Sequence, residues 1–296
     1  MTVDQDHKKF SGQIFKDLKQ RFIETLQVHY DPDELLNVAK IYFEDRFNIT
    51  RNHFDQFVTH PELEKFSLDL NKLSAGEPVQ YVVGKAYFFE NFFSVTPSVL
   101  IPRPETEELV ALAIERLSKQ IGQKPLNVLD IGTGSGCIAI SVRKKVKNIN
   151  MFALDISREA LDLAKINSNA LQTDVEFIEM NFLEDSGWIE LPTVDFLLSN
   201  PPYIVKNEAE HMAHRVKNFE PGQALFVTDD DPLVFYRKIF DFSNQKLKAG
   251  AEILTEISEF QSENLIRLCK EYVGFECKIH QDLQGKPRIL HAVKLC

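Results

Sequence analysis

The chain has 296 residues, which suffices for one large domain and a small one, each with its own buried core. Hydrophobic residues make up 44% and charged residues 26%, a composition that excludes a disordered or collagen-like chain. Lys and Arg number 34 against 44 Asp and Glu, so the formal net charge is −10. A chain this acidic lacks a general electrostatic attraction for nucleic acid or an anionic membrane, although a local basic patch is compatible with it.

The distribution of apolar residues and cysteines bears on the compartment. Charges, Gly or Pro interrupt every stretch that approaches the roughly 18 apolar residues of a membrane span. The first ten residues lack the apolar run of a secretory signal, and the four cysteines form no Cys-x-x-Cys pair. We therefore expect a reduced, cytoplasmic protein without a membrane segment. His211 and His214 lack a third ligand at a recognisable spacing, so we expect no metal.

The first 85 residues predict helices separated by short breaks. The start Asp31-Pro32-Asp33-Glu34 has a capping residue, a proline in the first turn and acids near the positive end of the helix dipole. A second apolar face runs from Leu63 to Leu73. This block has no strand pattern and no catalytic motif, so we expect residues 1–85 to form a small helical domain.

Residues 86–103 differ from this block because aromatic and β-branched side chains dominate them. A turn near Asn91 would fold them into a short hairpin. Pro102 and Pro104 then predict a stiff extended connector, and Pro104 can begin a helix over residues 104–119. We expect residues 86–103 to be a hairpin and linker, followed by a second domain at residues 104–296.

From residue 126 onward, strands and helices alternate. The predicted strands are Leu126–Ile131, Met151–Asp155, Val175–Glu179, Val194–Ser199, Ala251–Ile257, Phe275–Gln281 and Ile289–Leu295. The predicted helices span residues 136–146, 157–170, 232–248 and 258–272. This alternation predicts an α/β fold with a doubly wound, Rossmann-like parallel sheet. Only a short turn separates the last two strands, which predicts a C-terminal antiparallel hairpin.

A glycine-rich loop, Gly132-Thr133-Gly134-Ser135-Gly136, lies where the first of these strands becomes a helix. Glycines permit a tight turn and a close approach of a ligand, to which the following helix presents unpaired amides. The spacing is one residue shorter than that of the dinucleotide motif, which suits a nucleoside ligand without a pyrophosphate. Asp155 ends the next strand, where a carboxylate can accept both ribose hydroxyls. The alternative is a glycine-rich turn with a structural aspartate.

This combination resembles the S-adenosyl-L-methionine-dependent methyltransferases of the Rossmann-like class. The resemblance covers residues ~100–296 and includes the terminal antiparallel hairpin. It implies that the loop holds the amino-acid end of S-adenosyl-L-methionine and that Asp155 holds the ribose.

A second motif, Asn200-Pro201-Pro202-Tyr203, directly follows the strand Val194–Ser199 and so lies at the carboxyl edge of the sheet. The Asn200 carboxamide oxygen and the next backbone carbonyl can accept both protons of a planar NH₂ group and aim its nitrogen. The prolines stiffen the segment and remove two donors, and Tyr203 can stack on a planar substrate group. The motif therefore favours nitrogen methylation. The alternative is a rigid strand exit with Asn200 as a turn residue.

Further motifs resemble the peptide chain release factor glutamine methyltransferases over nearly the whole chain. They are Pro78 to Gly84, Leu100 to Glu107 and Asn200 to Ile204, joined by Phe219-Glu220-Pro221 and by Asp282 to Arg288. The resemblance implies methyl transfer to the glutamine side-chain amide in the Gly-Gly-Gln loop of bacterial release factors. It also implies that residues 1–85 recognise the release factor.

The same resemblance assigns site residues. The implied cofactor-binding residues are Gly132, Thr133, Gly134, Ser135, Gly136, Asp155, Asn181, Phe182 and Asn200. The implied substrate-binding residues are Asn200, Pro201, Pro202 and Tyr203, of which Asn200, Pro201 and Tyr203 are expected to be catalytic. Asn181 stands where the family usually has an acid, so it keeps an acceptor oxygen for the adenine amine but lacks the charge.

Two other functions are compatible with these motifs. A nucleic-acid amino-methyltransferase uses a similar motif on adenine, but it must extrude its target base and needs a cationic groove, which the net charge of −10 disfavours. A cofactor-binding scaffold without activity is disfavoured by the intact Asn200-Pro201-Pro202-Tyr203 motif.

Overall fold

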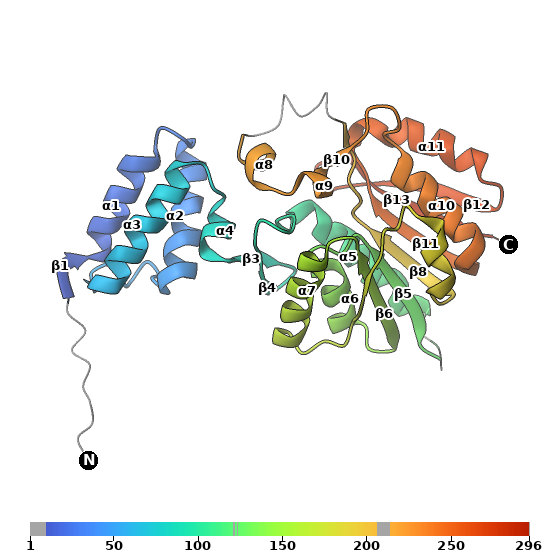
Figure 1. Cartoon of the computed structure of the whole chain (residues 1–296), viewed down its shortest axis with the longest axis horizontal. Helices are drawn as coiled ribbons and strands as arrows, with labels where there is room; N and C mark the ends of the chain where they lie inside the picture. The colour runs from blue at the N-terminus through green and yellow to red at the C-terminus, as the bar shows by residue number, and fades with distance from the viewer. Residues whose placement is uncertain (1–9, 121, 123, 206–213, 296) are drawn as a thin grey trace, which may run out of the picture. The chain divides into compact units, whose positions relative to one another are not determined.

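The computed structural model describes residues 10–120, 122, 124–205 and 214–295, which divide into two compact units (Figure 1). Of these, residues 10–85 and 214–219 form the smaller unit, and the others form the larger unit. This division differs from the predicted domains at two places. Residues 86–103 belong to the larger unit rather than to a separate linker, and residues 214–219 belong to the smaller unit.

The smaller unit is built mainly from helices, as predicted. Its elements are β1 (Phe10–Ile14), α1 (Phe15–Leu26), α2 (Pro32–Phe47), β2 (Phe57–Thr59), α3 (His60–Ser74), α4 (Val79–Val83) and α8 (His214–Phe219). Aromatic side chains of the helices pack together, with the rings of Phe22 and Tyr42 stacked at 5.1 Å. β1 and β2 pair antiparallel, so the prediction that this block contains no strand is wrong.

Helix α8 is tied to the smaller unit by Arg215. The Arg215 guanidinium donates to a Glu34 carboxylate oxygen at 2.8 Å and to the His29 carbonyl oxygen at 2.5 Å. It also lies 3.4 Å from the centroid of the Tyr30 ring, a cation–π contact. These contacts join segments far apart in the chain, which explains why sequence order alone assigned residues 214–219 to the other domain.

The larger unit contains a seven-stranded sheet in the order β12-β13-β11-β8-β5-β6-β7. These strands are β5 (Leu126–Ile131), β6 (Ile149–Asp155), β7 (Glu176–Glu179), β8 (Val194–Ser199), β11 (Leu247–Glu256), β12 (Phe275–Gln281) and β13 (Pro287–Lys294). The five from β11 to β7 are parallel, and β13 runs antiparallel to both of its neighbours. The predicted doubly wound sheet with a C-terminal antiparallel hairpin is therefore confirmed.

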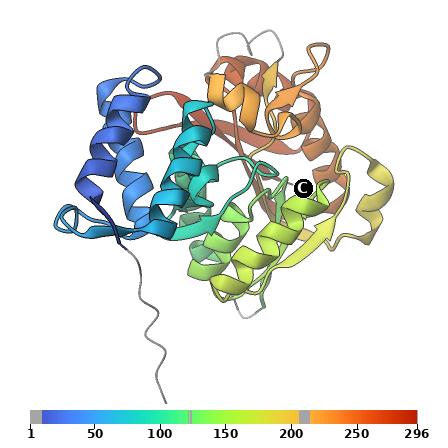
Figure 2. The same ribbon diagram turned by 60° about the vertical axis from the view of Figure 1, so that its left-hand side comes forward.

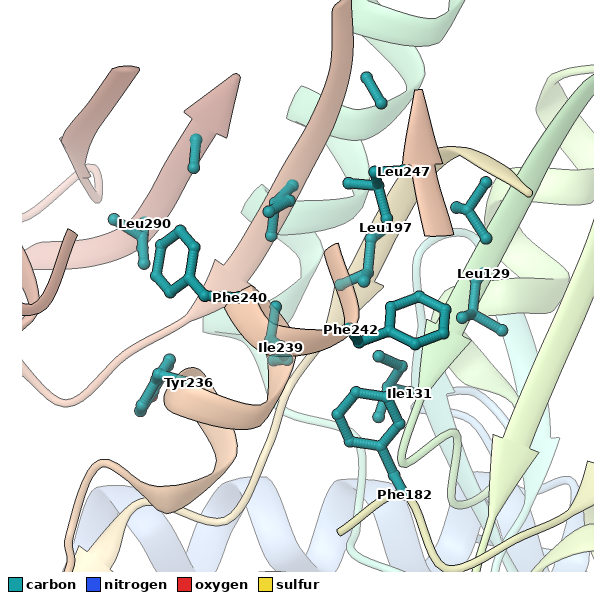
Figure 3. Packing of buried hydrophobic residues seen from close by; sticks show 14 of the residues in the cluster. Leu129, Ile131, Phe182, Leu197, Tyr236, Ile239, Phe240, Phe242, Leu247 and Leu290 are labelled. Atoms are coloured by element: carbon teal, nitrogen blue, oxygen red, sulfur yellow. The ribbon is translucent and has the colours of Figure 1, made fainter. Parts of the chain in front are cut away.

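Helices cover both faces of this sheet (Figures 1 and 2). They are α5 (Pro104–Gln120), α6 (Cys137–Lys145), α7 (Arg158–Ala170), α10 (Val234–Lys246) and α11 (Ser262–Glu271); shorter elements are β3 (Lys85–Phe88), β4 (Asn91–Ser94), β9 (Ile204–Val205), α9 (Gly222–Leu225) and β10 (Phe226–Val227). Strand side chains alternate between two cores. Val128 packs with residues of α5 and α6, whereas Leu129 and Ile131 pack with residues of α10 (Figure 3).

The hairpin of β3 and β4 forms where predicted, but its turn lies before Asn91. Phe89 and Glu90 are the turn residues, with φ of 43° and 64°. Positive φ at both central residues is typical of the hairpin turns that match the strand twist. Asn91 begins β4, and its side chain donates to the Phe89 carbonyl oxygen at 2.7 Å. The residue that marked the turn in the sequence therefore stabilises it from the following strand.

No helix within the described residues is long and apolar enough to cross a membrane.

A buried charge cluster fixes α5 on strand β11. Arg116 of α5 donates two hydrogen bonds of 2.8 Å to the Glu252 carboxylate. His291 of β13 lies 2.7 Å from the same carboxylate, whose side chain is only 3% exposed. Burial alone would raise the pKa of Glu252, but the hydrogen bonds from His291 and Arg116 lower it to about 2. Glu252 therefore stabilises the fold as a carboxylate.

We predict that Glu252→Gln lowers the melting temperature at pH 7 by at least about 5 °C, because it leaves Arg116 without its counter-charge and disrupts the hydrogen bonds of a buried carboxylate. Since the folded-state pKa of Glu252 is depressed, its stabilisation is present above its unfolded pKa and is lost as the pH falls towards 2. The gap between wild type and variant should close below pH ~4.5 in thermal scans. Glu115→Gln, on an exposed residue of α5, is the control. A gap independent of pH would contradict this account.

Candidate active site

The larger unit contains a cavity of about 350 Å³ at the carboxyl ends of β5, β6 and β8, a volume in the range of small-molecule sites. The predicted site residues that line it are Gly132, Thr133, Gly134, Ser135, Asp155, Asn181, Phe182, Asn200, Pro201 and Pro202. Strands β5, β6 and β8 are neighbours in the sheet, so segments far apart in sequence meet at this edge. Gly136 and Tyr203 are not among the lining residues.

The glycine loop is attached to the end of the neighbouring strand. The N–H groups of Gly132 and Thr133 both donate to the Leu154 carbonyl oxygen, at 2.9 and 3.0 Å. Thr133 also donates its hydroxyl to the Asp130 carboxylate at 2.7 Å. Asp130 is fully buried, and this desolvation raises its pKa to about 7. Hydrogen bonds to the Leu154 carbonyl oxygen and to the buried Asp130 carboxylate thus fix the conformation of the loop.

Gly132 and Gly134 face open space. Both have positive φ, and a Cβ at either residue would meet no protein atom within 4 Å. This cradle, together with the carboxylate of Asp155, fits a nucleoside ligand with an amino-acid end, as the sequence motifs predict. Gly132, Gly134 and Asp155 would hold S-adenosyl-L-methionine.

Gly136 has a different role from the other two loop glycines. Its φ is 80°, and a Cβ would lie 2.8 Å from Ile140 Cδ1 and 3.2 Å from Ala164 Cβ. Gly136 therefore permits α6 and α7 to approach each other, so we assign it to packing rather than to ligand contact.

Asp155, at the end of β6, is oriented by two backbone amides. Its Oδ2 accepts from the Gly134 N–H at 2.8 Å, and its Oδ1 accepts from the Ser157 N–H at 2.9 Å. Burial raises the pKa of Asp155, and these two hydrogen bonds oppose that shift. A carboxylate offers about four acceptor positions, and the Ile156 N–H also contributes, so at least one position remains for a hydroxyl donor.

Asn181 and Phe182 line the cavity, but each also has a partner in the protein. Asn181 Oδ1 accepts from the Leu183 N–H at 3.2 Å, and its Nδ2 donates to Glu184 at 2.8 Å. The Phe182 ring is 4% exposed and packs against Trp188 at 5.4 Å, as part of the core in Figure 3. The oxygen expected to accept from adenine therefore has one lone pair already engaged.

Asn200 is oriented by a residue from another element. Its Nδ2 donates to Thr106 Oγ1, in the first turn of α5, at 3.1 Å. Within the described residues, no donor reaches the Asn200 Oδ1, so this oxygen is available to accept a hydrogen bond from a ligand NH₂. Thr106 in turn donates to Glu256 Oε2 at 2.6 Å.

Tyr203 points its hydroxyl at the same carboxylate, donating to Glu256 Oε1 at 3.2 Å. Burial and the Glu256 charge raise the pKa of Tyr203. This contact gives Tyr203 a role in holding the motif, whereas stacking on a substrate group remains a prediction.

Sequence reasoning assigned no role to Thr106, Glu256, Arg103 or Glu220. Arg103 lines the cavity and donates to Glu220, which also accepts from the Ile101 N–H at 3.2 Å. The motifs that contain Arg103, Thr106 and Glu220 are visible in the sequence. Their spacing does not indicate that Arg103 contacts Glu220, or that Thr106 contacts Glu256. Glu256 lies at the end of an apolar strand, and its burial was the missing signal.

Among the described residues, no group of three or more His, Cys, Asp and Glu side chains is arranged to hold a metal ion. His211 lies outside the described residues.

Comparisons with known proteins find related methyltransferases. A family model for the methyltransferase small domain matches residues 109–220. The release factor glutamine methyltransferase of Flavobacterium psychrophilum is 34% identical over 281 residues, which cover 94% of this chain and 98% of the relative. That of Bacteroides thetaiotaomicron is 39% identical over 231 residues, which cover 78% of this chain and 80% of the relative. Among solved structures, the protein-(glutamine-N5) methyltransferase (release factor-specific) of Alicyclobacillus acidocaldarius is 27% identical, covers 69% of this chain and 100% of that chain, and has a TM-score of 0.43.

We predict that Gly136→Ala lowers the melting temperature more than Gly134→Ala does. Both changes place Ala at positive φ, which costs about 1 kcal/mol, but only Gly136 also has close neighbours. A drop of about 4–10 °C for Gly136→Ala, against about 2–4 °C for Gly134→Ala, is expected in thermal unfolding. Equal drops would contradict the packing role of Gly136.

We predict that Asp155→Ala weakens binding of S-adenosylhomocysteine in calorimetry by on the order of 1.5–3 kcal/mol, or about 10- to 150-fold, because a charged acceptor is lost. Glu179→Ala is the matched control, since Glu179 ends the adjacent strand beside Asp155 but is exposed and does not line the cavity. An unchanged dissociation constant for Asp155→Ala would refute the ribose assignment.

Proposed function

The chain belongs to the release factor glutamine methyltransferase family, because its match to the relative from Flavobacterium psychrophilum covers nearly the full length of both chains. From this membership and the geometry of the site we propose how the protein acts. It is an S-adenosyl-L-methionine-dependent methyltransferase. We propose that it methylates the side-chain amide nitrogen of the glutamine in the Gly-Gly-Gln loop of a peptide chain release factor. The observation that supports this most is the Asn200 carboxamide at the cavity, held by its nitrogen so that its oxygen is available.

S-adenosyl-L-methionine, when bound, supplies an electrophilic methyl group on a sulfonium. The remaining task of the protein is to present a weak nucleophile, because the amide nitrogen lone pair is delocalised. Asn200 Oδ1 and the Pro201 carbonyl oxygen would accept the two N–H groups of the substrate amide and so fix its plane. Pro201 and Pro202 have no N–H of their own and restrict the backbone, so the segment presents acceptors in one conformation.

The alkylated nitrogen becomes acidic, so no neighbouring general base is required in this scheme. Asp155 already has backbone donors to both oxygens. Glu256 is buried and engaged by Thr106 and Tyr203. The proton of the product nitrogen therefore passes to solvent as the product leaves. We attribute the acceleration mainly to positioning, which can contribute several kcal/mol.

We further propose that the smaller unit recognises the folded body of the release factor, so that only its loop has to enter the cavity. This places the reaction in the cytoplasm, where release factors act. A nucleic-acid amino-methyltransferase would need a cationic groove for the extruded strand, and the net charge of −10 favours a protein substrate.

The direct test offers the enzyme a release factor and double-stranded DNA side by side, with S-adenosyl-L-methionine labelled in its methyl group. We expect label in the release factor only, and a mass shift of one methyl on the loop glutamine. A release factor with glutamate in place of that glutamine is the control and should remain unlabelled. Label in DNA alone would replace the proposed substrate class with the alternative one.

We predict that Asn200→Ala lowers kcat for release-factor methylation by at least about 100-fold, because the amide nitrogen loses one of its two acceptors. The dissociation constant for S-adenosylhomocysteine should change by less than about 3-fold, because Asn200 contributes at most one minor contact to the bound cofactor product. Asn150→Ala, on an exposed side chain of β6, is the control. Retained turnover in Asn200→Ala would remove Asn200 from the mechanism.

A further inference from the structure

Asn200 stands at the end of a chain of hydrogen bonds that leads into the protein interior. Asn200 Nδ2 donates to Thr106 Oγ1 at 3.1 Å, and Thr106 donates to Glu256 Oε2 at 2.6 Å. The other carboxylate oxygen, Oε1, accepts from the Tyr203 hydroxyl at 3.2 Å. A single carboxylate is therefore connected to both ends of the segment from Asn200 to Tyr203.

The inner members of this chain are shielded from water. Thr106 is 2% exposed and Glu256 is 1% exposed. Glu256 ends β11, one residue after Thr255, which pairs with Ser199 of β8 directly before Asn200. The Glu256 backbone carbonyl accepts from the Tyr236 hydroxyl at 2.9 Å, which anchors the strand end itself. The members of the chain thus come from α5, from β11 and from the segment that follows β8.

The direction of these hydrogen bonds follows from the donor and acceptor inventory. A carboxylate only accepts, so Thr106 must give its single hydroxyl proton to Glu256. Thr106 Oγ1 then has only lone pairs for Asn200, and it accepts from the NH₂ side of the carboxamide. A flipped carboxamide would bring two oxygens face to face and leave buried lone pairs unpaired, which is unfavourable by roughly 1–3 kcal/mol.

We infer that Glu256 and Thr106 are positioning residues that set the orientation of the Asn200 carboxamide, so that its oxygen rather than its nitrogen faces the substrate amide. This inference rests on the proposed function. A free asparagine side chain presents either its oxygen or its NH₂ with similar ease, and an NH₂ would oppose the N–H groups of the glutamine. Through Thr106, the Glu256 carboxylate favours the one orientation of Asn200 in which its oxygen can accept from the substrate amide.

Three variants test the inference. Thr106→Val keeps the shape and removes the hydroxyl. Thr106→Ser keeps the hydroxyl and removes only a methyl group. Glu256→Gln keeps the shape but introduces an NH₂ that can donate to Thr106, so that Thr106 can donate to Asn200 instead and reverse the preferred orientation.

We expect Thr106→Val and Glu256→Gln each to lower kcat for release-factor methylation by about 10- to 100-fold. The KM for the release factor and the dissociation constant of S-adenosylhomocysteine should stay within about 3-fold, because neither residue selects the ligand by itself. Thr106→Ser should recover kcat to within about 3-fold of wild type. Adding Thr106→Val to Asn200→Ala should cause no further loss, since the two residues act on the same step.

Thr255→Val is the matched control. Thr255 is fully buried next to Glu256, and its Oγ1 has no hydrogen-bond partner among the described residues. This variant reports what a buried Thr-to-Val change does to folding alone, and its kcat should equal that of wild type.

Two outcomes overturn the inference: wild-type kcat in Thr106→Val, or a loss in Thr106→Ser as large as that in Thr106→Val. Losses that follow the melting temperature across all variants, Thr255→Val included, would show a structural role only. Whether the wild-type enzyme methylates the release factor tests the proposed function independently of these variants. A wild-type enzyme that does not label the release factor refutes the function itself.

Discussion

The parallel register of β5 with β6 and β8 is the constraint on which the site depends, because it ends three strands at one edge of the sheet. The Leu154 carbonyl oxygen at the end of β6 accepts from both Gly132 and Thr133, so the glycine loop turns directly over the neighbouring strand. Ser199 at the end of β8 donates its hydroxyl to the Ile131 carbonyl oxygen at 2.8 Å. The cofactor loop and the Asn200 segment are therefore held together by the strands themselves, before any ligand is present.

This constraint also explains what the sequence could predict. Apolar runs located β5 and β8 to the residue, since a strand in the middle of a covered sheet has a local apolar pattern. The strand ends then located the glycine loop, Asp155 and Asn200 near one another. Contacts between distant segments have no local signature, so the attachment of α8 through Arg215 was missed. The packing role of Gly136 against Ala164 was missed for the same reason.

The most informative omission is Thr106. It was part of a recognised motif, but its partner Glu256 lies 150 residues further along the chain. A sequence shows that both residues are present and cannot show that one donates to the other. The structure adds the direction of the hydrogen bond, and direction is what matters for a carboxamide whose two ends are similar in size and opposite in chemistry.

Strand β11 carries two buried carboxylates four residues apart, and both face α5. Ten residues of helix between Thr106 and Arg116 span about 15 Å, and four residues of strand between Glu256 and Glu252 span about 13 Å, so the two pairs fit side by side. Hydrogen bonds from His291 and Arg116 lower the pKa of Glu252, whereas burial raises that of Glu256 against the opposing effect of the hydrogen bonds from Thr106 and Tyr203. The ion pair at one end holds α5 against the strand, which allows the other end to use a neutral hydroxyl as a directional contact to Asn200.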